Sequence, residues 1–298
     1  GTAWGDISYV IGGYAWHANF SSMDNAMILT GPEAQYNLGS SDLGLSSGFA
    51  PYSPDTPDPG RFNCGPCHAT AYSPNGSQGG LSGIAGTWKE DGVGCEACHG
   101  PGSAHAAAPY AVMPKTSSGI ACADCHVRGS ASVVEASGGL ILHQQQAAEL
   151  MASPHSFMQC TRCHDPHAST HYDDQADGTA IVTECTTCHT GVTVGLNMSQ
   201  LACIDCHMPY AVKAGASKIF IDPALNENVF GDMRSHIFKI DTAAASPGEM
   251  FSDNGTKLGV DSSAKTAGLT VNFVCFRCHP AFSFDTMNSL AKQVHPVQ

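Results

Sequence analysis

The sequence has few basic residues and no long apolar run. Lysine and arginine number 13 against 26 acidic residues, which gives a net charge of −13 over 298 residues. Proteins that bind nucleic acid neutralise its phosphates with a basic surface, so this composition argues against a nucleic-acid partner. A helix that crosses a bilayer needs about 20 apolar residues, and the sequence has no such run. No charged segment followed by an apolar one, as in a secretion signal, precedes Trp4. We therefore expect a soluble, processed protein with no transmembrane segment.

The chain also has too little uninterrupted apolar sequence for long helices and strands. It contains 32 glycines and 17 prolines, and its hydrophobic fraction of 42% includes 14 cysteines. Glycine and proline interrupt regular structure, so helices and strands should be short. The length fits one large domain or two small ones. Something other than apolar side chains must therefore fill much of the interior.

No cysteine stands alone, because all of them fall into seven Cys-x-x-Cys pairs that are each followed directly by histidine. Two thiols at this spacing can each add to a vinyl group of one haem, and the next histidine then ligates the iron. The pattern predicts thioether attachment and proximal ligation at Cys64/Cys67/His68, Cys95/Cys98/His99, Cys122/Cys125/His126, Cys160/Cys163/His164, Cys185/Cys188/His189, Cys203/Cys206/His207 and Cys275/Cys278/His279.

Three other interpretations of paired cysteines compete with haem attachment: a disulfide framework, zinc sites and redox-active pairs. With 15 histidines in 298 residues, a histidine follows any one pair by chance about 5% of the time. Seven such coincidences in succession are a roughly one-in-a-billion event. The sequence therefore predicts seven covalently attached haem c groups. Thiols are coupled to haem outside the cytoplasm, so we expect an extracellular, cell-surface or periplasmic location.

Low-spin haem iron needs a second axial ligand, and the remaining histidines nearly match the number of irons. A lone histidine is usually a surface or core residue, but eight candidates for seven positions favour ligation. Bis-histidine ligation at all seven haems predicts low potentials. Methionine is the alternative ligand, and we interpret Met113, Met158, Met198 and Met208 as residues that pack against haem. The distal candidates are His17, His105, His143, His155, His167, His171, His236 and His295.

Local sequence indicates how some of these histidines reach an iron. A Gly-Pro-Gly turn precedes His105, and a proline precedes His167. Each turn directs the chain away from the preceding attachment motif, so that the histidine can reach the iron of a different haem. The segment between His143 and His155 lacks glycine and should be helical until Pro154 ends it. Such short turns imply haems that are packed closely together.

The spacing of the motifs divides the chain into three parts. Residues 1–63 form a haem-free arm, in which ISYVIGGYAW predicts a short strand or hairpin, with a simple tail as the alternative. Residues 64–207 form a six-haem core, in which Cys185 and Cys203 lie closest in sequence and predict neighbouring, parallel-stacked haems. Residues 208–298 carry the seventh haem and contain strand-like KIFID and LTVNFV. The three parts read as one continuous multihaem domain.

The expected fold class is mostly irregular structure with short α-helices around the attachment motifs and few short β-strands, wrapped around a closely packed haem chain. One haem for every few dozen residues leaves little room for a layered protein core. Iron ligation that forms only in the folded state contributes directly to folding free energy. The chain without haem should therefore be unfolded.

Several segments resemble known multihaem cytochromes. The runs CEACHGPGSAH, HQQQAAELMASPHSFMQCTRCHDPH and RSHIFKI resemble the tetrahaem cytochrome family of ammonia oxidisers, and ISYVIGGYAWHANF is similar to the first segment of many relatives. The overall plan also resembles extracellular filament-forming cytochromes of the OmcS and OmcE type. That resemblance implies stacked haems in a conducting homopolymer in which one haem takes its distal histidine from the next subunit. By its position in the chain, His17 is the candidate for this intersubunit ligand.

Three functions fit these observations. The first is an electron-conducting filament that passes electrons to redox partners or extracellular acceptors, with no enzymatic role. The second is a monomeric periplasmic electron shuttle, which differs from the first only in assembly. The third is a reductase of nitrite, hydroxylamine or a sulfur oxyanion, which needs an iron with an exchangeable position. A lysine-containing attachment motif often marks such an iron, and all seven motifs here carry histidine.

Overall fold

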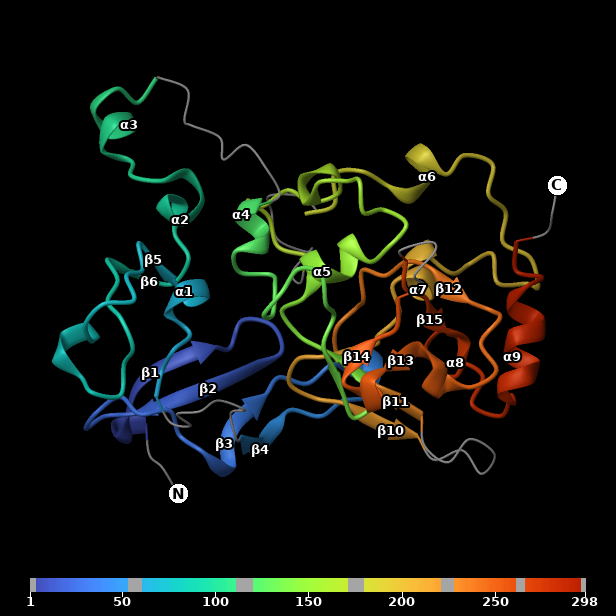
Figure 1. Cartoon of the computed structure of the whole chain (residues 1–298), viewed down its shortest axis with the longest axis horizontal. Helices are drawn as coiled ribbons and strands as arrows, with labels where there is room; N and C mark the ends of the chain where they lie inside the picture. Colours follow the sequence, from blue (N-terminus) through green and yellow to red (C-terminus); the bar gives the residue numbers. More distant parts are fainter. Residues whose placement is uncertain are drawn as a thin grey trace. The chain divides into compact units, whose positions relative to one another are not determined.

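The computed structural model describes residues 4–52, 61–110, 120–170, 180–220, 228–260 and 266–295. Its packing divides the chain into two compact units, residues 1–125 and 126–298, which are described separately below (Figure 1). The division falls inside the third motif, between Cys125 and His126. Within the described ranges, no helix has the length and apolar character needed to cross a membrane.

Unit 1 begins with a four-stranded antiparallel sheet whose strand order is β1-β2-β3-β4 (Figure 1). The strands are β1 (Ile7–Gly12), β2 (His17–Ser22), β3 (Gly31–Asn37) and β4 (Gly48–Tyr52). The β1–β2 hairpin turns through Gly12 and Gly13, whose φ angles of 78° and 84° lie in the left-handed region that glycine adopts without strain. The hairpin expected from ISYVIGGYAW is therefore present.

The hydrophobic core of unit 1 lies beside the first attachment motif. Phe62 and Trp88 are buried with their ring centroids 5.5 Å apart, and the Trp88 indole donates a 2.6 Å hydrogen bond to Asp91. The Tyr72 ring packs so close to Gly65, within the motif, that a Cβ at Gly65 would lie 2.6 Å from it. This glycine therefore lets the aromatic core approach the motif directly.

The remaining elements of unit 1 are short. Three small 3₁₀ helices lie at Trp4–Asp6, Ser41–Leu43 and Gln78–Gly80. The others are α1 (Gly65–His68), β5 (Ala69–Thr70), β6 (Glu90–Asp91), α2 (Cys95–His99), α3 (Ser103–Ala107) and α4 (Ile120–Ala123).

Unit 2 contains several small sheets around a shared core. The three-stranded sheet has the order β7-β8-β9, and β10–β11, β12–β15 and β13–β14 form two-stranded sheets. Ile141, Val212, Ile237 and Leu269 are fully buried. A Cβ at Gly231 would overlap the Val212 carbonyl, so only glycine allows this close backbone approach.

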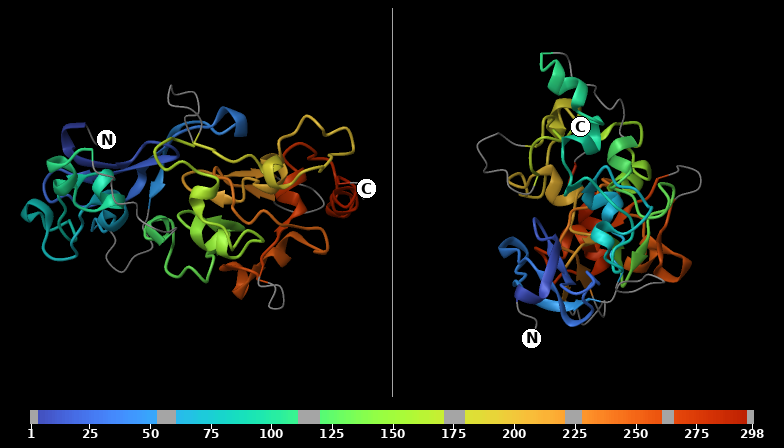
Figure 2. Two further views of the ribbon diagram at one scale, coloured as in Figure 1. Left: turned by 90° about the horizontal axis from the view of Figure 1, so that it is seen from above. Right: turned by 90° about the vertical axis from the view of Figure 1, so that its left-hand side faces the viewer.

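The elements of unit 2 are as short as those of unit 1, and long irregular connections join them (Figure 2). The 3₁₀ helices are Cys160–Arg162, Pro247–Met250 and Asp253–Gly255. The helices are α5 (Gln146–Met151), α6 (Cys185–Cys188), α7 (Cys203–His207), α8 (Val271–Cys275) and α9 (Phe284–Ala291). The strands are β7 (Ala136–Ser137), β8 (Leu140–Leu142), β9 (Val212–Lys213), β10 (Lys218–Phe220), β11 (Asn228–Phe230), β12 (Ile240–Asp241), β13 (Phe251–Ser252), β14 (Lys257–Leu258) and β15 (Leu269–Thr270).

The structure confirms the expected fold class of short helices, short strands and extensive loop. It also confirms the helix before Pro154, as α5, and a strand in KIFID, as β10. The strand expected over LTVNFV is wrong beyond its first residues. Thr270 ends β15 and caps α8 with extended backbone angles of −75° and 152°. The turn that presents the seventh motif thus overrides the β preference of valine and phenylalanine.

Candidate haem centres

Most attachment motifs are built on about one turn of helix. The backbone N–H of His68 donates to the Cys64 carbonyl at 2.9 Å, which closes the turn between the first cysteine and the histidine. Positions i, i+3 and i+4 share one face of a helix, so both sulfurs and the imidazole point the same way. The same bond recurs at His164–Cys160, His189–Cys185 and His279–Cys275, at 3.0, 2.9 and 2.9 Å.

The fourth motif departs from the expected short α-helix at Cys163. Its 3₁₀ helix ends at Arg162, so Cys163 follows the helix, with backbone angles of −110° and −27°. The Cys163 carbonyl accepts a 2.9 Å hydrogen bond from the Val182 N–H, and the next residue forms a β-bridge with Ile181. This pairing draws the chain out of the helix. Because the Cys163 N–H still donates to the Cys160 carbonyl at 3.1 Å, the two cysteines stay one turn apart, and thioether attachment through Cys163 stays a prediction.

The cysteines lie where a covalently attached group could cover them. All fourteen fall within the described ranges, where each is at least partly exposed to solvent and none forms a disulfide. Cysteine is ordinarily among the most buried residue types. Within the same described ranges, no group of three or more His, Cys, Asp or Glu side chains could hold a bare metal ion. Pairs of partly open thiols beside an imidazole fit haem c.

In unit 1, the attachment sulfurs of the first three motifs lie close together. The Cys67 Sγ is 3.9 Å from the Asp124 carbonyl oxygen. Burial raises the pKa of the Cys125 thiol to about 11, and the nearby thiols of Cys67 and Cys98 add to the rise. Haem attachment converts these thiols into thioethers, which do not titrate, so this effect reports their proximity.

In unit 2, the last three motifs are also neighbours. Partial burial of the thiol raises the pKa of Cys185, and adjacent Cys203 raises it further. Burial likewise raises the pKa of Cys275 to about 11, with contributions from Cys206 and Cys278. The thiols of Cys185 and Cys203 therefore lie close together, while neighbouring, parallel-stacked haems at these motifs stay a prediction.

Three ring contacts in unit 2 each join one attachment histidine to one spare histidine. Metal–imidazole bonds are about 2.0–2.1 Å long, so two rings that share one metal have centroids roughly 6 Å apart. The observed centroid distances fit this value. They are 5.8 Å for His207–His295, 5.9 Å for His189–His155 and 6.1 Å for His164–His236.

The His207–His295 pair has its nitrogens aligned. The two Nε2 atoms face each other at 3.5 Å, and the rings are nearly parallel, at 16°. The Nδ1 of His207 lies 2.8 Å from the Phe238 carbonyl, and that of His295 lies 3.0 Å from the Thr193 carbonyl. A carbonyl accepts only from a protonated Nδ1, so each Nε2 is left with its lone pair directed at the other ring.

Phe238 links three of these histidine sites. Its carbonyl oxygen accepts the His207 hydrogen bond, and its ring packs edge-on against His155 and His236, with centroids at 4.6 and 6.0 Å. Its φ of 59° is strained for a residue with a Cβ. Sequence reasoning missed this role, because nothing in RSHIFKI distinguishes this phenylalanine from an ordinary core residue.

Glu149 is a buried carboxylate behind His236. Its Oε2 accepts hydrogen bonds of 2.7 Å from the Ser235 hydroxyl and from the His236 backbone N–H. Oε1 has no partner among the described residues. Burial raises the pKa of Glu149 to about 7. Burial also lowers the pKa of His236 to about 4, with His164 and His126 adding to the effect.

The other distal candidates occupy varied positions. His17 begins β2 opposite Asn37, and His105 lies in α3 with a buried Nδ1 that has no partner among the described residues. His143 lies between β8 and α5, and the exposed His167 contacts Asp165 at 3.1 Å. The remaining candidate, His171, lies outside the described residues.

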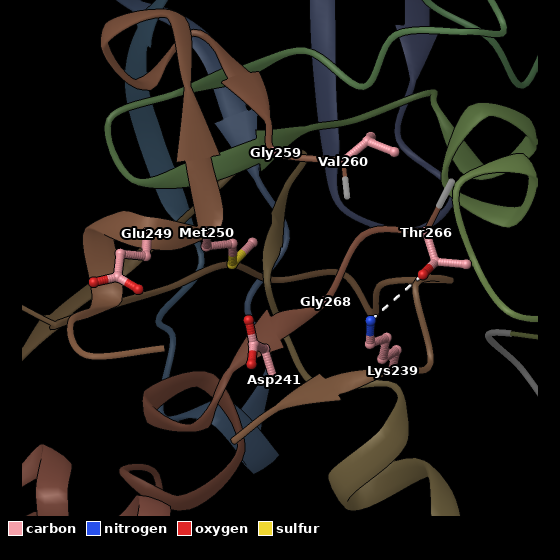
Figure 3. A pocket seen from close by; sticks show the side chains of 8 residues that line it. All are labelled: Lys239, Asp241, Glu249, Met250, Gly259, Val260, Thr266 and Gly268. Atoms are coloured by element: carbon pink, nitrogen blue, oxygen red, sulfur yellow. Dashed lines mark hydrogen bonds between the residues drawn. The ribbon is translucent and has the colours of Figure 1, made fainter. Parts of the chain in front are cut away.

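Two hollows in unit 2 differ in character. The first, of about 500 Å³, is lined by Phe157, Met158 and Cys188 among others, so that an apolar wall adjoins the fifth motif. The second, of about 250 Å³, is lined by polar side chains that include Lys239, Asp241 and Glu249 (Figure 3). The first hollow has the apolar character that suits a haem face, and the haem-packing role expected of Met158 stays a prediction. The second contains no motif residue.

Comparison with known proteins agrees with this chemistry. Residues 55–100 match the family described as cytochrome c554 and c-prime. The fold is similar to octaheme sulfite reductase MccA of Wolinella succinogenes, with a TM-score of 0.53 and 15% identity over 91% of this chain and 56% of that one. It is also similar to outer cell wall cytochrome OcwA, with a TM-score of 0.50 and 15% identity over 96% of this chain and 74% of that one.

A third solved structure is an undecaheme cytochrome from the S-layer of Carboxydothermus ferrireducens. It aligns with 96% of this chain and 52% of its own, at 19% identity and a TM-score of 0.47. The chain thus spans about half the length of MccA and of this cytochrome. No curated protein sequence matches it. The family match over residues 55–100, the fold and the seven attachment motifs are those expected of a multihaem c-type cytochrome.

Proposed function

We propose that the chain binds seven haem c groups, each iron ligated by two histidines, and conducts electrons as the subunit of an extracellular filament. Haem supplies an iron that gains and loses one electron. The fourteen motif cysteines hold the haems, the seven motif histidines are the proximal ligands, and the spare histidines supply distal ligands. The haems are distributed unevenly along the chain. Residues 1–63 carry none, residues 64–207 carry six and residues 208–298 carry one.

The observation that carries this proposal is the spacing of the three histidine pairs. An iron with imidazole on both faces has no position left for a substrate, so it transfers electrons without binding one. Paired ring centroids of 5.8 to 6.1 Å support such saturated irons. Close attachment sulfurs in each unit support haems near enough to exchange electrons.

The number of haems is tested by intact mass spectrometry of the native protein. The native protein should exceed the mass of its polypeptide by seven haem masses, and a smaller number would refute the count. Conversion of one motif to Ser-x-x-Ser-His should remove one haem mass. Made at Cys160 and Cys163, this change also tests whether the cysteine beyond the 3₁₀ helix carries a thioether.

The proposal also includes assembly of the chain into a filament. His17 starts β2 in the hairpin of unit 1, and we assign it as the ligand that reaches a haem of the next subunit. Electron microscopy of the native protein should reveal long uniform filaments. His17→Ala should prevent them while leaving seven attached haems, whereas Tyr14→Ala, at an exposed position on the same hairpin, should polymerise normally.

Single particles from the wild type would favour a periplasmic shuttle. Normal filaments from His17→Ala would remove His17 from the intersubunit role. The partners of either form are other redox proteins or extracellular acceptors, which suits the outer cell wall location in the name of one structural neighbour.

A reductase is the second candidate, because MccA is named a sulfite reductase. It requires one iron with an exchangeable ligand. Addition of sulfite to the oxidised protein should leave its visible spectrum unchanged if every iron is saturated. A shifted Soret band together with sulfite-dependent oxidation of the reduced protein would favour the reductase.

A further inference from the structure

We infer the distal iron ligands of three haems in unit 2, an assignment that rests on the proposed function. Each pairs one motif histidine with one spare histidine that is distant in sequence. The pairs are His207 with His295, His189 with His155, and His164 with His236.

Of the three pairs, His207 and His295 have the most detailed geometric support. Both Nδ1 atoms donate to backbone carbonyls, so two Nε2 lone pairs oppose each other at 3.5 Å. No proton lies between them in this tautomer, and facing lone pairs repel. A cation between them removes the repulsion, and two metal–nitrogen bonds in line require about 4 Å. The rings therefore need to separate by only about half an ångström to accept one iron.

The chain on either side of His295 is held by internal contacts. Gly195 donates a 2.7 Å hydrogen bond to the Val294 carbonyl, next to the Thr193 carbonyl that accepts from His295. Helix α9 leads into this segment and is capped by Ser283, whose hydroxyl accepts from the Thr286 N–H at 3.2 Å. His295 is thus positioned over its own chain's sixth motif, which makes it an internal ligand.

The other two spare histidines are fixed by buried side chains. The fully buried Ser153 accepts the His155 backbone N–H at 3.0 Å, and the fully buried Glu149 accepts that of His236 at 2.7 Å. In both cases a polar group inside the protein holds the backbone of the proposed ligand.

The test uses the holo-protein with His295→Ala and reads the spin state of the iron. Loss of one distal imidazole should turn one haem in seven from low-spin to high-spin in the electron paramagnetic resonance spectrum. Added imidazole should restore the low-spin form. The matched control is Gln293→Ala, two residues away, where the side chain donates to the Ser289 carbonyl of α9. This control should keep every haem low-spin.

The iron that His295 ligates is then identified by removing the haem of the sixth motif. A Cys203→Ser/Cys206→Ser variant, with six haems by mass, should show no new high-spin iron when His295→Ala is added. A high-spin haem in that background would assign His295 to another iron and overturn the pairing. If the variant does not accumulate, an experimental density map of the wild-type holo-protein shows which imidazole faces His207 across the iron.

His155→Ala and His236→Ala should each produce one high-spin haem, and combining either with His295→Ala should produce two. One high-spin haem in a double variant would mean a shared iron and refute the assignment. An entirely low-spin His295→Ala protein would overturn the pairing but leave the proposed function standing. A high-spin haem in the wild type would instead refute full saturation.

Discussion

Glu149→Gln should change how the stability of the protein depends on pH. The carboxyl group is fully buried, and burial raises its pKa from 4.5 to about 7. Between these values the folded protein holds a proton that the unfolded chain has released, so stability falls as pH rises. The favourable contribution is complete below pH 4.5 and is lost as pH passes through about 7. At about 1.4 kcal/mol per pH unit, the loss over this interval is about 3 kcal/mol.

Glutamine retains an oxygen that can accept from Ser235 and His236 but does not titrate. The free energy of unfolding is obtained from urea titrations at about pH 5 and about pH 8.5, on either side of the folded-state pKa. The haems are kept reduced, so that no ferric charge near His236 perturbs the pKa of the Glu149 carboxyl. The difference between wild type and Glu149→Gln should shift by about 3 kcal/mol between the two pH values. The exposed Glu249→Gln serves as the control. A constant difference for Glu149→Gln would refute a buried, titrating carboxyl.

Three further outcomes are expected. Gln145→Ala should destabilise the protein by about 3 kcal/mol in urea titrations, because its buried amide makes bonds of 2.6 to 2.9 Å to the Glu135 backbone and the Leu142 carbonyl; a loss under about 1 kcal/mol would contradict this. Phe238→Gly should relieve backbone strain and alter the low-spin resonances of neighbouring haems while the carbonyl bond to His207 persists; unchanged resonances would remove its positioning role. The chain produced without haem should lack a cooperative thermal transition by circular dichroism, and a compact, cooperatively melting apoprotein would contradict haem-dependent folding.

Local structural features of this protein can be predicted from its sequence. The Cys-x-x-Cys-His spacing predicts one helical turn, and most motifs have it. The glycine pair in the first hairpin and the absence of glycine in α5 are similarly local signals. Where the sequence misleads, tertiary pairing overrides it. Residues beyond Thr270 belong to the turn that presents the seventh motif, and Cys163 leaves its helix because its carbonyl pairs with Val182.

The pairing of distal histidines could not be predicted in this way. His207 and His295 are 88 residues apart, and their contact depends on α9 and the loop at Thr193. The same holds for Glu149, which holds His236 from 87 residues away. Sequence indicated how many imidazoles were available, while tertiary packing decides which imidazole faces which iron.

The saturation of every iron is tested most directly by electron paramagnetic resonance of the fully oxidised native protein, with spins integrated against the haem content. Seven low-spin ferric haems and no stoichiometric high-spin signal are predicted. A high-spin signal equal to one haem would reveal an iron with an open position, and would contradict a protein that only carries electrons.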